Sequence, residues 1–187
     1  MSAQVGVKNL YYAKMTTEDT ASSAPVYGDM KELLVGKLVD IGVDVETEEA
    51  SIYADDAKYD EASAITDISV SINVAELPLE AQAELLGHTV TNGVMDAKSS
   101  DTAPYVGLAF EFTKKNGKKR FVKLFKGTFK EVSEQGQTKG QSIEFQTKAL
   151  EGSFLPLKNN KTWKKVADEE ATGYTDTTGS NWYSSML

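Results

Sequence analysis

Apolar residues recur at every second position along most of this chain, which is the period of a β-strand with one buried face. The alternation is clearest over residues 39–45 and 68–74, and it continues on both sides of the dipeptide Asn116-Gly117. Shorter strands are expected at residues 5–12, 51–54, 142–149, 154–157 and 162–166. Half-buried strands must pack their apolar faces together, so the predicted fold is an antiparallel β-sandwich or saddle-shaped barrel.

The strongest local signal is a β-hairpin turning at Asn116-Gly117, a dipeptide that favours a two-residue turn. A two-residue loop predicts that these residues pair across the hairpin: Phe112 with Phe121, Phe110 with Lys123, Leu108 with Phe125 and Val106 with Gly127. In this register the phenylalanines share one core-facing side of the sheet.

One short helix is expected at about residues 78–87, in PLEAQAELLG. Pro78 suits the first helical position and Gly87 a left-handed stop, while Leu79, Ala83 and Leu86 recur at helical spacing. The helix is expected to lie across an open end of the β structure.

The chain has 187 residues, no cysteine and one histidine, which excludes thiol chemistry, disulfides and zinc sites rich in Cys or His. No phosphate-binding glycine motif occurs, and His88 has no triad around it, so the helix dipole at Gly87 is its expected partner. We therefore expect no enzymatic activity, no catalytic residue, no cofactor and no metal. Neither a signal peptide nor a run of 18 apolar residues is present, so membrane anchoring is not expected.

The length fits one β domain, residues 1–170, followed by a polar C-terminal arm, residues 171–187, that carries Tyr174, Trp182 and Tyr183. Both terminal arms are expected to be flexible. The aromatic residues of the arm indicate that it binds a partner.

Charge is distributed unevenly along the chain. Residues 1–100 have 18 acidic and 6 basic side chains, a net charge of −12, whereas residues 101–187 have 10 acidic and 14 basic ones, a net charge of +4. This asymmetry fits nucleic-acid binding by the basic half, a match between the halves, or a head-to-tail match between copies.

The acidic half contains a long segment, at about residues 46–64, that we expect to be a loop. Its adjacent aspartates and lack of glycine argue against a calcium site. Because Ile52 and two tyrosines lie among the acids, docking against a neighbour is favoured over simple solvation. The candidate docking residues are Glu46, Glu48, Glu49, Tyr53, Asp55, Asp56, Tyr59, Asp60 and Glu61.

The basic half contains a cluster at the hairpin tip. Its members, the candidate complementary surface, are Lys114, Lys115, Lys118, Lys119 and Arg120. The predicted register turns the phenylalanines inward, and the whole chain has a net charge of −8, so a nucleic-acid platform is disfavoured.

Five segments in order carry a family resemblance: KNLYYAKMT (8–16), YADD through LPLEAQAELLGHTV (53–90), DTAPYVGLAFEFTKKNGKKRFVKLFKGTF (101–129), SIEFQTKALEGSF (142–154) and WKKVADEE (163–170). Together they resemble the major tail protein, or tail tube protein, family of long, non-contractile tailed phages and prophages of Gram-positive bacteria. Residues 17–36 and 171–187 lie outside the resemblance.

The resemblance implies a virion tail protein, assembled in the cytoplasm of the host bacterium. Hexameric rings would stack into a hollow tube through which DNA passes without specific binding, and the 46–64 loop would reach an adjacent ring. Tape-measure, tail terminator and distal tail proteins would be further partners. The alternative is a phage-encoded β-sandwich that binds carbohydrate through Tyr53, Tyr59, Trp163 or Trp182.

Overall fold

The computed structural model describes residues 2–33, 38–54, 57–132 and 147–187, with the side chains of residues 50–62 left aside. The strands and helices in chain order are β1 (Gln4–Thr17), β2 (Val26–Tyr27), β3 (Lys31–Glu32), β4 (Leu38–Ala54), β5 (Ala57–Val74), α1 (Leu79–Leu86), β6 (Thr89–Thr91), β7 (Val94–Asp96), β8 (Val106–Lys114), β9 (Lys119–Phe129), β10 (Lys148–Leu155), β11 (Lys164–Asp168) and α2 (Asp176–Ser180). The prediction of a mainly β, antiparallel fold with a short flanking helix is confirmed, and the barrel is not closed.

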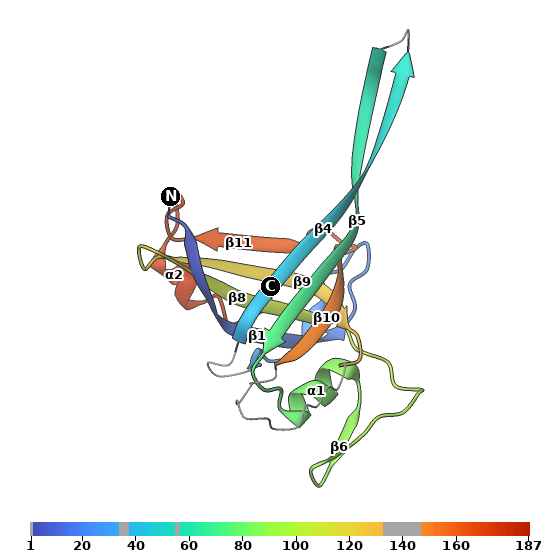
Figure 1. Ribbon diagram of the computed structural model, residues 1–187, viewed down its shortest axis with the longest axis vertical. Helices are drawn as coiled ribbons and strands as arrows, with labels where there is room; N and C mark the ends of the chain where they lie inside the picture. Colours follow the sequence, from blue (N-terminus) through green and yellow to red (C-terminus); the bar gives the residue numbers. More distant parts are fainter. Residues whose placement is uncertain (1, 34–37, 55–56, 133–146) are drawn as a thin grey trace, which may run out of the picture.

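Nine strands form one curled antiparallel sheet in the order β2-β1-β8-β9-β10-β5-β4, with β3 paired to β1 and β11 to β9 (Figure 1). Strand β9 divides one edge between two partners: its first half pairs with β11 and its second half with β10. Among the described residues β4 pairs only with β5, so β4 is an edge strand at the open seam. Strands β6 and β7 form a separate small hairpin.

The main core lies inside the curl of the sheet. Leu10, Leu108, Phe110, Ile72 and Leu150 are fully buried there, contributed by four strands that face one another. Helix α1 packs its own buried residues, Leu85 among them, against the same core at one end of the molecule. The predicted helix is confirmed, including Gly87 as its left-handed C-cap at φ 81°.

Between its turn and Leu108 the β8–β9 hairpin differs from the predicted register by one residue, whereas the predicted pair of Val106 with Gly127 is confirmed beyond a register shift. Asn116 does not have a positive φ, and the Gly117 N–H donates to the Lys114 carbonyl before Gly117 takes φ 81°. This is a three-residue loop, which pairs Phe110 with Val122. A slip of one residue moves every side chain to the other face, so Phe110 faces the main core and Phe121 the opposite side.

The segment expected to be a long acidic loop, residues 46–64, is instead a β-ribbon. Strands β4 and β5 stay paired from Leu38 opposite Val74 to Ala54 opposite Ala57, and their distal part projects clear of the body (Figure 1). The alternation of apolar and polar residues did not reveal this ribbon, because a strand pair satisfies its backbone hydrogen bonds between its own two strands whether or not a face is buried.

The C-terminal arm was expected to be flexible, but it folds back on the outer face of β8 and β9. Trp182 and Met186 are buried there, and Trp182 packs with Ala109 and Phe121. Gly107 makes room for the arm, because a Cβ at this glycine would lie 2.7 Å from the terminal methyl carbon of Met186. Residues 171–187, which were predicted to be a flexible arm, therefore cover the apolar outer face of the sheet.

Candidate assembly surfaces

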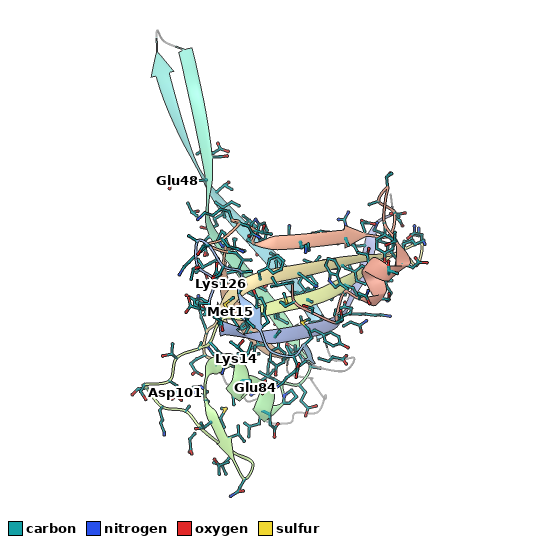
Figure 2. All side chains as sticks on the ribbon, turned by 180° about the vertical axis from the view of Figure 1, so that it is seen from behind. Lys14, Met15, Glu48, Glu84, Asp101 and Lys126 are labelled. Carbon is teal, nitrogen blue, oxygen red and sulfur yellow. The ribbon has the colours of Figure 1, made fainter. Side chains whose placement is uncertain are left out.

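The ribbon presents the first part of the candidate docking segment to solvent. Glu46, Glu48 and Glu49 are exposed, and Figure 2 shows Glu48 where the ribbon leaves the body, far from Glu84 and Asp101 at the opposite end. The distal ribbon strands also contain Tyr53, Tyr59, Asp60 and Glu61, whose side chains lie outside the described part of the structure. Two further members of the docking segment, Asp55 and Asp56, lie entirely outside the described residues. Their docking role stays a prediction.

The predicted basic surface lies around the β8–β9 turn, where carboxylates of the same chain pair most of its cations. The measured pairs are Lys114 Nζ with Asp168 Oδ1 (2.5 Å) and Glu170 Oε2 (2.6 Å), Arg120 Nε with Asp168 Oδ2 (2.8 Å), Lys119 Nζ with Glu111 Oε1 (2.9 Å) and Lys118 Nζ with Glu169 Oε2 (3.9 Å). Among the described residues Lys115 has no ion pair, and its N–H donates to the Ala3 carbonyl.

These pairs change what the basic cluster can offer to a partner. Burial opposes ionisation of Asp168, but hydrogen bonds from Lys114, the Glu170 N–H and Arg120 outweigh it and lower the pKa of Asp168 to about 2. The carboxylate therefore stays charged at neutral pH and holds the buried Lys114. The binding of an acidic segment from another copy to this basic surface stays a prediction. Much of the positive charge of the surface is already compensated within the chain.

His88 lies between two carboxylates rather than simply capping the helix. Its Nδ1 is 2.8 Å from Asp101 Oδ2, its Nε2 is 2.7 Å from Glu131 Oε1, and its side chain is buried. The hydrogen bond to Asp101 is the main cause that raises the pKa of His88 above its ordinary 6.5, although burial opposes the shift. The hydrogen bond between His88 and Asp101 joins the end of α1 to the turn that follows β7.

We expect the protonated His88 to stabilise the fold on the acid side. Because its pKa is higher in the folded state, the contribution is fully present below pH 6.5 and is lost as pH rises through the folded pKa. Since His88 is the sole histidine, proton NMR of its imidazole gives the midpoint directly. Asp101→Asn should lower that midpoint, whereas Asp96→Asn, on exposed β7, should not. A midpoint unchanged in Asp101→Asn would contradict this role.

A second feature is an apolar groove of about 240 Å³ at the open seam of the sheet. Its apolar lining comes from β4, β8, β9 and β11: Ile41, Val43, Phe110, Phe112, Val122 and Val166. Gln4, Arg120 and Lys164 complete it, so the charged groups at this groove are cations, and no acidic side chain is among its described lining residues. Sequence reasoning missed this groove because it depends on how β11 lies relative to β4, which no local pattern encodes.

A third feature is a polar pocket of about 380 Å³ beneath the C-terminal arm. The buried Glu111 lies at its base and accepts hydrogen bonds from Asn9 Nδ2 at 3.0 Å and the Tyr183 hydroxyl at 3.2 Å. Burial is the largest cause that raises the pKa of Tyr183 above its ordinary range, and the charge of Glu111 is the second. These contacts fasten the arm to the bulged part of β1.

Within the described ranges, no group of three or more Asp, Glu, His or Cys side chains is arranged to hold a metal ion. The helices in the described part of the chain also include none that is long and apolar enough to span a membrane.

The fold resembles that of the anti-feeding prophage cap, a tube terminating cap solved by cryo-electron microscopy. The TM-score is 0.51 at 7% sequence identity, and the alignment covers 90% of this chain and 95% of the cap chain. At this identity the likeness concerns the fold. No protein-family model matches the sequence, and no curated protein matches it.

Proposed function

We propose that this protein is a structural component of a phage or prophage tail, and specifically a tube subunit whose hexameric rings stack into a hollow channel for DNA. The observation that carries the proposal is the fold, which this chain shares over nearly its whole length with a tube terminating cap of a prophage particle. The tube-subunit assignment, and a phage of Gram-positive bacteria as its source, rest on the five resembling segments.

Two features of the molecule support assembly through unlike surfaces. The edge strand β4 has one side without a strand partner among the described residues, and an exposed edge is a template for pairing unless a neighbour covers it. The ribbon extends beyond the body, so it can reach a neighbouring copy (Figure 1). Contacts between different patches on identical subunits generate rings when they close and filaments when they do not.

Negative-stain electron microscopy of the purified protein tests the proposal. A tube subunit is expected to form stacked rings or hollow tubes of variable length as concentration rises. Persistence as a monomer across the concentrations and salt conditions tested would overturn it.

The same images distinguish a tube subunit from a second candidate function, that of a terminating cap. The likeness to the anti-feeding prophage cap favours this second candidate. A cap closes a tube and does not extend it, so it would give discrete rings of one size. Tape-measure, terminator and distal tail proteins remain expected partners, and the bore is expected to pass DNA without specific contacts. No enzymatic activity forms part of the proposal.

The carbohydrate-binding alternative gains no support from the described aromatic residues. Trp182 is buried where the arm packs on the sheet, with its Nε1 3.5 Å from the Val122 carbonyl, and Trp163 packs against the main core. A stacking platform for a sugar ring needs an exposed aromatic face. The side chains of Tyr53 and Tyr59 lie outside the described part.

A further inference from the structure

We propose that Asn92 is a site of spontaneous deamidation in this protein, and that the fold protects the second Asn-Gly dipeptide, at Asn116, from the same reaction. The proposal concerns the chemistry of the chain itself, so it does not depend on the proposed function. Two identical dipeptides in one chain allow a direct comparison, because their intrinsic reactivity is similar and their surroundings differ.

The reaction needs only the side chain, the next backbone nitrogen and water. The Gly93 nitrogen gives up its proton to solvent base and bonds to Cγ of Asn92, while the Cγ–Nδ2 bond breaks and Nδ2 takes up a proton and leaves as ammonia. Water then opens the resulting succinimide ring at either carbonyl and leaves an aspartyl or isoaspartyl residue, which is negatively charged. Glycine favours this reaction at the preceding asparagine, because it has no Cβ to hinder the attacking nitrogen.

Asn92 and Gly93 form the turn of the β6–β7 hairpin, where neither reacting group is held. Both residues are exposed, with φ 53° at Asn92 and 77° at Gly93. Apart from its chain neighbours, nothing in the described structure lies within 4 Å of the place where a Cβ on Gly93 would stand. Within the described part of the chain, neither the Asn92 side chain nor the Gly93 N–H makes a hydrogen bond. The side-chain amide and the attacking nitrogen are therefore open to solvent.

The β6–β7 hairpin can also open to the geometry that ring closure needs. Closure requires the chain around Asn92 to leave its turn conformation, so the rate depends on how readily the hairpin opens. Three residues of β6 pair with three of β7, and among the described strands these two pair only with each other. Figure 1 shows this hairpin beyond α1, away from the curled sheet. An isolated hairpin is marginally stable in water, so opening costs little free energy here.

Asn116 and Gly117 form the same dipeptide but are held at both reacting groups. Nδ2 of Asn116 donates to Glu170 Oε1 at 2.7 Å, and its Oδ1 accepts the Lys118 N–H at 3.2 Å. The attacking nitrogen is also engaged, because the Gly117 N–H donates to the Lys114 carbonyl at 2.9 Å. Strands β8 and β9 belong to the main sheet, where β8 also pairs with β1 and β9 with β11. Ring closure at Asn116 must break these contacts, so the reaction is slowed there.

Incubation of the full-length protein at mildly alkaline pH, followed by peptide mapping with mass spectrometry, tests the proposal. We expect acid to replace amide at Asn92 at least about tenfold faster than at Asn116, because an exposed hairpin opens more often than the main sheet. In guanidinium chloride, where the fold is lost, both sites should react at similar rates. Equal rates in the folded protein, faster reaction at Asn116, or no reaction at Asn92 while the unfolded control reacts would each overturn the proposal.

Two neighbouring variants test the contact that protects Asn116. Glu170→Ala removes the acceptor of the Asn116 amide, so deamidation at Asn116 should become several-fold faster while the rate at Asn92 stays the same. The matched control is Glu169→Ala, which removes a carboxylate whose described ion pair is with Lys118 at 3.9 Å, and it should change neither rate. An unchanged rate at Asn116 in Glu170→Ala would overturn the protective role of this hydrogen bond.

Discussion

Shortening the β4–β5 ribbon should abolish stacking of subunits and leave each subunit folded. Glu48 and Ala64 lie opposite each other in the strand register, so residues 49–63 can be replaced by Asn-Gly, which closes the shortened hairpin with a favourable turn. Every named member of the three buried clusters lies outside the removed part, so these clusters remain in the shortened chain. We therefore expect a circular dichroism spectrum that still reports a folded β protein, a similar unfolding midpoint and no tubes in electron micrographs.

A matched variant separates ribbon length from ribbon charge. Glu46, Glu48 and Glu49 changed together to Gln keep the full ribbon but remove three exposed charges. If charge mainly guides register and encounter, this variant should assemble more slowly and with a weaker dependence on salt, but it should still assemble. Tubes of normal appearance from the shortened chain would contradict a stacking role for the ribbon.

Replacing Lys126 by Met should destabilise the subunit more than any exposed substitution. The Lys126 side chain is 2% exposed, and its Nζ lies 2.7 Å from Asp19 Oδ1, 3.3 Å from Glu18 Oε2 and 4.4 Å from the centre of the Tyr105 ring. Asp19 is itself buried and also accepts the Lys158 N–H. Removing the cation leaves an uncompensated buried carboxylate, so we expect a loss of about 3–5 kcal/mol in the free energy of unfolding.

The pH dependence of the Lys126 effect follows from Asp19. Burial opposes its ionisation, but the bond from Lys126 and the backbone bond from Lys158 outweigh burial and lower the pKa of Asp19 below its ordinary value of 3.8. A lowered folded pKa stabilises the protein above pH 3.8, and this contribution is lost as pH falls through the folded pKa. Urea unfolding at pH 7 and at decreasing acidic pH should therefore show a shrinking difference between Lys126→Met and the unaltered protein.

Two further variants make the Lys126 prediction specific. Lys118→Met removes an exposed cation 3.9 Å from Glu169 and should change stability by less than about 1 kcal/mol. Combining Lys126→Met with Asp19→Asn removes the buried charge as well, so the double variant should be more stable than Lys126→Met alone. A double variant as unstable as the sum of its single changes would mean that the two side chains do not act as a pair.

The sequence predicted elements whose signals are local. The helix ending at Gly87 and the antiparallel strands appear where apolar spacing and turn residues place them. The β8–β9 register near the turn was wrong by one residue, because Asn116-Gly117 is compatible with both a two-residue and a three-residue loop, while the pair of Val106 with Gly127 was predicted correctly. Gly117 alone takes the left-handed conformation here, and packing against the buried arm and core selects that register.

The arm and the ribbon were misjudged for opposite reasons. Residues 171–187 are mostly polar and have no long periodic pattern, yet Trp182 and Met186 find a socket formed by Gly107 and Ala109 on the outer face of β8. The ribbon segment is acidic in sequence, yet its strands pair from Leu38 opposite Val74 to Ala54 opposite Ala57. The deciding contacts of the arm lie outside its own segment, whereas those of the ribbon join its two strands across the hairpin.

The sequence by itself determined a mainly antiparallel β fold, one helix, the uneven charge and a resemblance to tail tube proteins, because strand period, helix caps and composition are properties of neighbouring residues. Only the tertiary structure decided that Asp168, Glu169 and Glu170 neutralise much of the basic hairpin, and that β11 lies beside β4 to form an apolar groove. Ion pairs and grooves join segments far apart along the chain, and their positions depend on how the whole sheet curls.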